Sequence, residues 1–218
     1  MLSFLLFVKR NRRTAIVMTE SIQSIKADLR RTVREQLAAM SASQREQASA
    51  AIVQRLTQLD ALAAASTAMF YMPIKSEVDV TDAVRWALQR GRTVCVPQTD
   101  PSTREMEPVV VADLDDAAMI FDEHGIRTPR NGWSVPQEQI DVAVVPGRAY
   151  TTTGHRLGRG AGYYDRFLKR LRPDAVVIGV GFEQQIVEEI PIDDHDVLMD
   201  VVVTDGRVSF GASPRDGR

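Results

Sequence analysis

The sequence predicts an α/β fold, namely a single-domain three-layer α/β/α arrangement with a mostly parallel sheet, an N-terminal helical pair and a C-terminal hairpin. Three observations predict it. Short apolar runs typical of buried strands alternate with segments of helical periodicity. The 218 residues, of which 44% are hydrophobic, suffice to bury one sizeable core. No repeat or long linker divides the chain. We expect the domain at residues 21–210, after a disordered or non-native extension at 1–20 and before a disordered tail at 211–218.

The first half of the chain is expected to contain two helices followed by a β-α-β unit. Apolar residues recur at helical spacing from residue 24 to about 65, and the polar turn at 41–44 offers a new N-cap, so two helices are expected there. Residues 68–72 and 93–97 are typical of buried strands, and 79–89 have a helical pattern. Because the connections are short, the two strands should be parallel and joined by a right-handed crossover.

The same alternation continues in the second half. The expected elements are a strand at 140–146, a helix at 163–172, a strand at 175–180, and a terminal hairpin with a type I′ turn at Asp205-Gly206. Residues 98–139 are rich in proline, aspartate and glycine. They are therefore predicted to be mostly loop, with one or two short strands such as 107–111.

The composition limits the class of partner. The 27 basic and 29 acidic residues nearly cancel, so no long-range field favours nucleic acid or an anionic membrane. A small anionic ligand would need local positive groups. The single cysteine, Cys95, lies in an apolar run, which excludes an intrachain disulfide and a multi-cysteine metal site. We expect a buried thiol and a reducing, cytoplasmic location.

The N-terminus combines an apolar run at residues 2–8 with a basic cluster that follows it. A secretory signal places its charges first, and this run is far too short to span a bilayer. Attachment to a membrane surface is the alternative. We expect Met18 to be the natural start, and residues 1–17 to be disordered or non-native.

Residues 154–165 carry the strongest chemical signal. Glycines 158, 160 and 162 lie at alternate positions between an expected strand and an expected helix, where backbone N–H groups can converge on an anion. The helix N-terminus adds partial positive charge. Arg156 and Arg159 can bind phosphate or carboxylate, and Asp165 can hold magnesium. A phosphate-binding loop is the functional interpretation, and a glycine-rich turn with solvated arginines is the structural one. Neither a dinucleotide fingerprint nor a Walker A loop fits the spacing.

The segment R-L-G-R-G-A-G-Y-Y-D at residues 156–165 resembles the R-L-G-x-G-x-G-Y-Y-D signature of the 5-formyltetrahydrofolate cyclo-ligases. Other segments resemble that family in the same order. They are the K-x-x-L-R pattern at 26–30, E-V-D at 77–79, the G-I-x-E-P turn at 125–129, the strand at 141–147, and the tail through Pro191 and Asp196. The resemblance covers roughly residues 24 to 206.

The resemblance implies ATP-dependent cyclisation of 5-formyltetrahydrofolate to 5,10-methenyltetrahydrofolate with release of ADP and phosphate. The formyl oxygen would be phosphorylated and N10 would then attack. The implied ATP contacts are Lys26, Arg30, Arg156, Leu157, Gly158, Arg159, Gly160, Ala161, Gly162, Tyr163 and Tyr164. The implied folate contacts are Met72, Glu77, Tyr163 and Tyr164, the implied magnesium ligands are Asp165 and Asp196, and the implied catalytic residues are Arg156, Arg159 and Tyr163. None of His124, His155 and His195 is needed as a catalyst. We expect a monomer that binds folate and ATP but neither nucleic acid nor membrane.

Three residues depart from the family pattern. Ala161 stands where some relatives have lysine, Thr151 replaces an aspartate, and Thr128 replaces the glutamate of G-I-x-E-P. A lost carboxylate near the metal could weaken magnesium binding. Two alternatives therefore stay open: a small-molecule kinase that uses the same loop, and a catalytically silent relative that binds folate or nucleotide.

Overall fold

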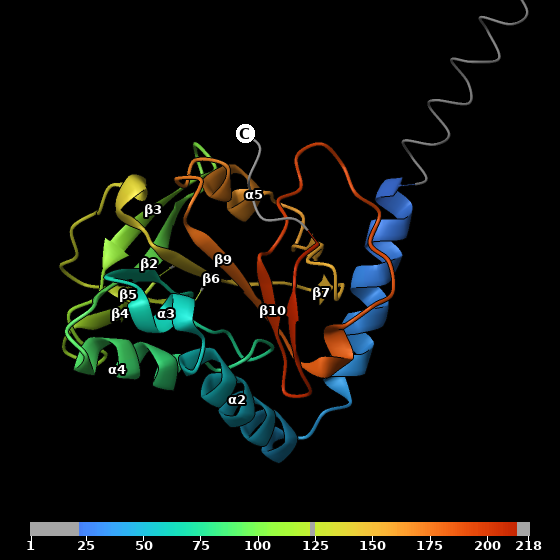
Figure 1. Ribbon diagram of the computed structural model, residues 1–218, viewed down its shortest axis with the longest axis horizontal. Coiled ribbons are helices and arrows are strands. Elements are labelled where there is room, and N and C mark those ends of the chain that lie inside the picture. Colours follow the sequence, from blue (N-terminus) through green and yellow to red (C-terminus); the bar gives the residue numbers. More distant parts are fainter. Residues whose placement is uncertain (1–21, 123–124, 213–218) are drawn as a thin grey trace, which may run out of the picture.

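Seven strands form one twisted sheet in the order β11-β10-β9-β6-β1-β2-β3 in the computed structural model of the chain (Figure 1). The structure describes residues 22–122 and 125–212. The five inner strands are parallel: β10 (Val201–Val203), β9 (Val176–Val180), β6 (Val142–Pro146), β1 (Thr67–Met69) and β2 (Thr93–Asp100). The edge strands β11 (Val208–Phe210) and β3 (Glu105–Val110) run antiparallel to their neighbours. The predicted α/β fold with a mostly parallel sheet is confirmed.

The central strand β6 shows why the domain has three layers. Val142 and Val144 belong to one hydrophobic cluster, and Ala143 and Val145 belong to a second. Successive side chains of a strand point to opposite faces, so β6 is buried on both. The first cluster takes in the N-terminal helices and α4 (Thr81–Gln89), whereas α5 (Tyr163–Leu168) contributes Phe167 and Leu168 to the second. Figure 1 shows α2 and α4 on one side of the sheet and α5 on the other.

The N-terminal helices follow the prediction with one difference. A helix covers residues 22–38, and α2 (Ala42–Thr57) begins after Ser41. Ser41 and Gln44 form a capping box, in which each side chain accepts a hydrogen bond from the other residue's backbone N–H. The predicted second helix is interrupted after Thr57, and a separate five-residue helix, α3 (Asp60–Ala64), follows.

The region 98–139 contains more sheet than expected. β2 continues to Asp100 and pairs with β3 over six residues, including Pro97 opposite Pro108. Prolines usually argue against a strand, but an edge pair tolerates their missing N–H groups. A small hairpin of β4 (Met119–Phe121) and β5 (Arg127–Pro129) follows, then the short helix η1 (Gln137–Gln139).

The segment after β6 also differs from expectation. It first forms a two-residue hairpin, β7 (Ala149–Tyr150) with β8 (Arg156–Leu157). Tyr150 fixes this hairpin to the sheet, because its hydroxyl donates to the carbonyl of Val145 or Val180, which lie 2.9 and 3.1 Å away. Helix α5 then has six residues and ends at Leu168, four residues earlier than predicted. So short a helix has little dipole to offer an anion.

The C-terminal hairpin is confirmed, but its turn is not of type I′. That turn requires positive φ at both central residues, and neither Asp205 nor Gly206 has one. Instead the Thr204 hydroxyl accepts hydrogen bonds from the backbone N–H groups of Gly206 and Arg207, at 3.2 and 3.0 Å. The short helix η2 (Glu183–Gln185) precedes this hairpin along the chain.

The predicted terminal segments lie largely outside the described residues. This holds for the extension at 1–20, for the expected start at Met18, and for residues 213–218. The first two residues of the predicted tail are ordered, since Gly211 and Ala212 donate hydrogen bonds to the carbonyls of Asp200 and Thr153 at 2.8 and 3.1 Å. No helix in the described part of the chain is both long and apolar enough to cross a membrane.

Candidate functional site

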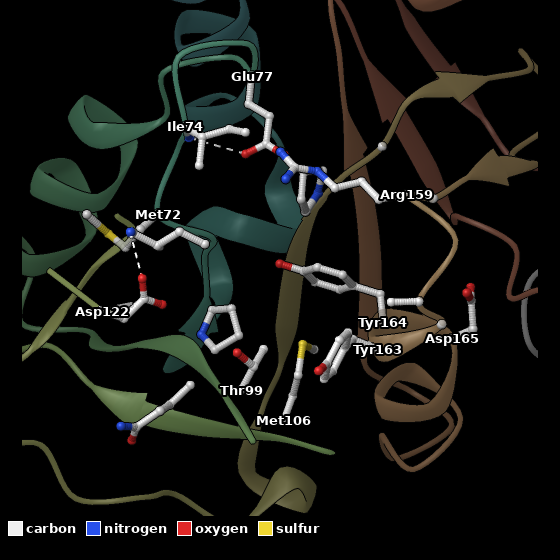
Figure 2. Close-up of a pocket in the computed structure, with 18 of the residues that line it drawn as sticks. Met72, Ile74, Glu77, Thr99, Met106, Asp122, Arg159, Tyr163, Tyr164 and Asp165 are labelled. Atoms are coloured by element: carbon white, nitrogen blue, oxygen red, sulfur yellow. Dashed lines mark hydrogen bonds and ion pairs between the residues drawn. The ribbon is translucent and has the colours of Figure 1, made fainter. Parts of the chain in front are cut away.

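Two cavities share a wall formed by residues 156–165, which we call the glycine loop. The apolar cavity has a volume of about 330 Å³ (Figure 2) and is lined by Met72, Ile74, Glu77, Pro97, Gln98, Thr99, Met106, Asp122, Ile126, Thr128, Pro146, Gly147, Arg156, Gly158, Arg159, Ala161, Gly162, Tyr163, Tyr164 and Asp165. The cationic cavity, of about 510 Å³, is lined by Gln23, Lys26, Arg30, Arg104, Arg156, Leu157, Gly158, Gly160, Ala161, Gly162, Asp165, Arg166, Lys169, Asp193, His195 and Asp196. A ligand in either cavity would therefore contact the same loop.

The glycine loop takes its shape from two residues with left-handed backbone geometry. Gly160 has φ +109° and Gly162 has φ +70°, both in the region that strains residues with a side chain. Gly162 lies immediately before α5, so the chain turns there from the loop into the helix. The alternation of glycines in the sequence is explained at these two positions by backbone conformation.

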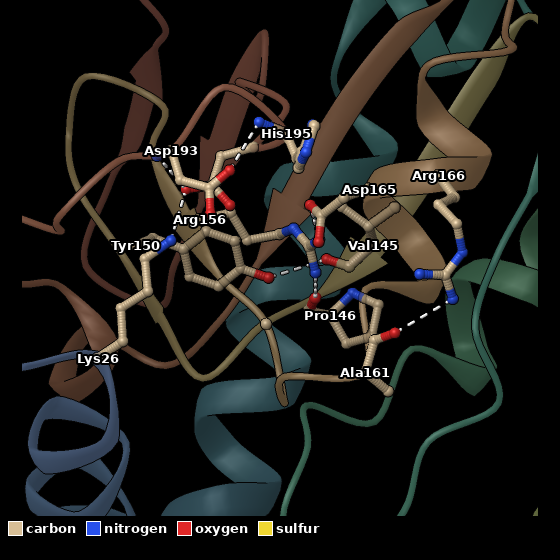
Figure 3. Close-up of polar contacts among 12 residues, drawn as sticks. Lys26, Val145, Pro146, Tyr150, Arg156, Ala161, Asp165, Arg166, Asp193 and His195 are labelled. Carbon is tan, nitrogen blue, oxygen red and sulfur yellow. Dashed lines mark hydrogen bonds and ion pairs between the residues drawn. The ribbon is translucent and has the colours of Figure 1, made fainter. Parts of the chain in front are cut away.

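Arg156 holds the base of the loop from β8. Its guanidinium donates to the carbonyl of Pro146 at 3.1 Å through Nη1 and to Asp165 Oδ1 at 2.7 Å through Nη2 (Figure 3). The side chain is only 3% exposed, and its charge is balanced by Asp165. It also lies 5.4 Å from the centre of the Tyr164 ring. Arg156 thus ties β6, the loop and α5 together at the wall between the two cavities.

Lys26 and Arg30 bring the N-terminal helix to the cationic cavity. Lys26 Nζ lies 2.8 Å from Asp196 Oδ2, and its side chain is 7% exposed. Arg30 Nε donates to the carbonyl of Gly158 at 2.9 Å. Burial lowers the pKa of Arg30, against the opposing field of Asp196. The predicted K-x-x-L-R segment and the glycine loop therefore meet in space, although about 130 residues separate them.

Besides the Arg156–Asp165 pair in the shared wall, the apolar cavity is lined by a second ion pair, Arg159–Glu77. Arg159 Nη2 lies 2.7 Å from Glu77 Oε1, and the backbone N–H of Ile74 donates to the other carboxylate oxygen at 3.3 Å (Figure 2). Burial raises the pKa of Tyr164 well above its ordinary value, and the negative charge of Glu77 raises it further. Tyr164 therefore stays neutral and can act as a hydrogen-bond donor.

The structure brings the predicted residues together but divides them between the cavities. Lys26, Arg30, Leu157 and Gly160 line the cationic cavity, and Met72, Glu77, Tyr163 and Tyr164 line the apolar one. Arg159, expected at the phosphates, lines the apolar cavity instead, because its guanidinium turns toward Glu77. Leu157 lines the cationic cavity but is only 2% exposed as a whole residue, so it offers little surface to a ligand.

Several lining residues were missed from the sequence. Arg104, Arg166 and Lys169 line the cationic cavity, while Pro97, Gln98, Thr99 and Met106 line the apolar one. Of these residues, only Arg166 could have been found from the sequence, because it directly follows the signature segment at residues 156–165. The others come from the β2–β3 hairpin and α5, and only the sheet topology brings them to the loop.

The three departures from the family pattern have different surroundings. Thr151 is 3% exposed, lines neither cavity, and accepts a hydrogen bond from the backbone N–H of His155 at 3.0 Å. Its role here is to hold a turn, so the expected loss of a metal-proximal carboxylate does not apply at this position. Thr128 does line the apolar cavity, and its buried hydroxyl has no hydrogen-bond partner among the described residues. Ala161 lines both cavities.

The carboxylates suit magnesium only together with a phosphate ligand. No group of three His, Cys, Asp or Glu side chains placed to hold a metal exists within residues 22–122 and 125–212. Asp165 and Asp196 both line the cationic cavity, but each is paired with a cation. Mg²⁺ commonly takes one or two carboxylates plus phosphate oxygens and water. His195 lines the same cavity, with Nδ1 3.4 Å from Lys169 Nζ, and His124 lies outside the described residues.

Comparison with known proteins agrees with the motif-based resemblance. The model of the 5-formyltetrahydrofolate cyclo-ligase family matches residues 22–205. A 5-formyltetrahydrofolate cyclo-ligase of Mycolicibacterium smegmatis is 34% identical over 145 residues, which are 65% of this chain and 74% of the relative. The Mus musculus enzyme of that name is 24% identical over 200 residues, covering 84% of this chain and 95% of the relative. The NMR structure of Aquifex aeolicus 5,10-methenyltetrahydrofolate synthetase has a TM-score of 0.75 at 32% identity, covering 89% of this chain and 95% of that one.

Proposed function

The chain belongs to the 5-formyltetrahydrofolate cyclo-ligase family, and from this premise we propose that it catalyses the ATP-dependent cyclisation of 5-formyltetrahydrofolate to 5,10-methenyltetrahydrofolate. The observation that carries the proposal is the pair of cavities on the two sides of the glycine loop. One has the apolar walls that suit a pterin, the other has the charge that suits a polyphosphate, and both reach Arg156 and Asp165. Such a shared wall is where a phosphoryl group would pass between the two ligands.

The apolar cavity supports the binding of the folate. Its volume of about 330 Å³ lies in the range of small-molecule sites, and Met72, Tyr163 and Tyr164 offer flat or flexible apolar surface to a bicyclic ring. Glu77 and Arg159 add polar groups that can orient the ring. A hydrogen bond from neutral Tyr164 would favour developing negative charge on a nearby oxygen.

The cationic cavity supports the binding of ATP. Six basic side chains line it against three acidic ones, a local excess of three positive charges in a chain whose net charge is −2. Lys26 and Arg156 are already neutralised by Asp196 and Asp165. The excess therefore rests on the other cations, which can contact phosphate. Asp165 and Asp196 would hold Mg²⁺ with the phosphate oxygens, and the ion would neutralise part of the phosphate charge.

The chemistry follows from placing the two ligands against this wall. The formyl oxygen attacks the γ-phosphorus, the bond to the β-phosphate oxygen breaks, and ADP leaves. The activated formyl carbon is then attacked by N10 of the same folate, which loses its proton as the phosphate departs. Because that attack is intramolecular, a fixed pose of the pterin supplies much of the roughly 7–11 kcal/mol that positioning can provide. We assign the orientation of the transferring group to Arg156, and contacts to the formyl end of the folate to Arg159 and Tyr163.

The direct test mixes the purified protein with 5-formyltetrahydrofolate, ATP and Mg²⁺ and follows the methenyl chromophore by near-ultraviolet absorbance. We expect a rise that requires both ATP and the metal ion, with stoichiometric phosphate. A stable phosphorylated product without the chromophore would indicate a kinase. Saturable binding of both ligands with no turnover would indicate a silent relative, and either result would overturn the proposal.

A further inference from the structure

Arg166 lies at the cationic cavity with its charge unbalanced by any carboxylate in the described part of the chain. Its Nε and Nη2 donate to the carbonyl of Arg104 at 3.2 and 2.7 Å, and Nη2 also donates to the carbonyl of Ala161 at 3.1 Å (Figure 3). Nη1 donates no hydrogen bond to any of residues 22–122 or 125–212. A guanidinium that is held by three bonds and lies 5.5 Å from the centre of the Tyr163 ring therefore still keeps two N–H groups for another partner.

Arg104 provides a second, independent observation. Among the described residues it is the one non-glycine residue with positive φ, at +58°, a conformation that costs about 1 kcal/mol or more. The carbonyl of this strained residue accepts two of the three hydrogen bonds that Arg166 donates. The side chain of Arg104 lines the cationic cavity as well. Through the Arg104 backbone, Arg166 thus holds at the same cavity a second cation that forms no ion pair within residues 22–122 and 125–212.

Ala161 lines both cavities but brings no charged group to either of them. The Arg166 guanidinium occupies the neighbourhood of residue 161, since it hydrogen-bonds the carbonyl of Ala161 and its Nη1 lies 2.9 Å from where a Cβ on Gly162 would be. Arg166 on α5 therefore places a positive charge next to residue 161 of the glycine loop.

We propose that Arg166 binds the polyphosphate of the nucleotide through its free Nη1, beside the uncharged Ala161, and holds Arg104 at the same cavity. This rests on the proposed function for the identity of the ligand. The competing interpretation is that Arg166 merely ties the β2–β3 hairpin to the glycine loop. The two interpretations differ in one respect: a lysine at 161 can restore the charge, but it cannot restore the bonds to the Arg104 carbonyl.

The experiment measures binding of ATP with Mg²⁺ by calorimetry in the full chain, together with KM for ATP and for 5-formyltetrahydrofolate. We expect Arg166→Ala to weaken ATP binding by about tenfold or more, as for loss of a charge-assisted contact, with little change for the folate. The double variant Ala161→Lys/Arg166→Ala should recover most of that loss. Arg170→Ala is the matched control, because Arg170 lies one turn further along, pairs with Glu105 and lines neither cavity.

Three outcomes would overturn the proposal: normal ATP binding by Arg166→Ala, no recovery on adding lysine at 161, or no ATP binding by the parent protein. Should Arg166→Ala fail to fold, Arg166→Gln tests the same charge while keeping an amide donor for the Arg104 carbonyl. Failure of the cyclisation itself gives a different signature. In that case the parent protein binds ATP and the variants follow the expected order, but no methenyl product forms.

Discussion

At the scale of single residues, Arg156 makes two hydrogen bonds through the two terminal nitrogens of its planar guanidinium, and no other cationic side chain has such a group. Its two terminal nitrogens reach acceptors on different elements, Pro146 on β6 and Asp165 on α5. Lysine has a single nitrogen on a flexible stem and cannot hold both in a planar fork. Arg156→Lys should therefore leave either the buried carbonyl or the carboxylate without its partner, at a cost of about 1–3 kcal/mol in unfolding free energy.

Arg156→Lys should also lower turnover, roughly tenfold or more, because the glycine loop would no longer be held in a fixed position by the bonds to Pro146 and Asp165. Urea denaturation and steady-state kinetics measure the two effects. Arg207→Lys is the control, since Arg207 pairs with Glu183 near the C-terminal hairpin and lines neither cavity. If the two variants had the same turnover and the same unfolding free energy, Arg156 would not be what positions the glycine loop.

Site residues that belong to one contiguous motif could be predicted from the sequence, whereas residues that reach the site from distant segments could not. The glycine loop is contiguous, so its residues could be identified together, and Lys26, Glu77 and Asp196 followed from family order. The direction of Arg159 could not be predicted, because it depends on Glu77, which lies 82 positions away in the chain. Arg104 carries no motif, and it reaches the cationic cavity only through the β2–β3 hairpin and the hydrogen bonds from Arg166.

At the scale of elements, the turn into α5 allows a comparison between two glycines. Gly162 and Gly91 have φ of +70° and +69°, so alanine at either position carries the same backbone strain of about 1–2 kcal/mol. A Cβ at Gly91 would meet nothing within 4 Å, whereas one at Gly162 would lie 2.9 Å from Arg166 Nη1. We expect Gly162→Ala to lose at least as much stability as Gly91→Ala, measured by urea denaturation, because moving the Arg166 guanidinium also disturbs its hydrogen bonds to Arg104 and Ala161.

Only Gly162→Ala should also weaken ATP binding, by several-fold, because it displaces the guanidinium of Arg166. Calorimetric titration with ATP and Mg²⁺ measures this difference. Unchanged affinity in both variants would mean that the position of Arg166 does not matter for the nucleotide.

The elements that could be predicted are those with a period or a cap. The apolar runs of β1, β6 and β9 and the Ser41–Gln44 capping box are such cases. β7, β8, β4 and β5 are two or three residues long, too short for a period to show. The terminal turn was assigned the wrong type because Asp-Gly favours I′, whereas the Thr204 hydroxyl, a tertiary detail of this hairpin, stabilises another geometry.

At the scale of the whole molecule, Cys95 reports on the opening of the sheet. It is fully buried on β2, and burial raises the pKa of its thiol to about 12. Because the thiolate is the reactive form, we expect no reaction with a thiol reagent at about pH 8 in the native state, and one equivalent after unfolding. Reaction rates across a urea series measure this. Rapid labelling of the native protein would mean that β2 opens locally, without unfolding of the domain.

Asp141 joins three parts of the molecule and should make stability depend on pH. Burial alone would raise its pKa, but hydrogen bonds from the backbone N–H groups of Thr67 and Ser66, and the Arg172 guanidinium, outweigh burial and hold the pKa below its ordinary value. The unfolded chain therefore binds this proton more readily than the native one. The stabilisation is complete above the unfolded value, near about pH 4, and is lost as the pH falls through the lower native value. Asp141→Asn should be less stable than the parent at neutral pH. The unfolding free energies of the two proteins should converge as the solution is acidified, and curves that stay parallel from neutral pH into acid would show that another carboxylate governs the acid transition.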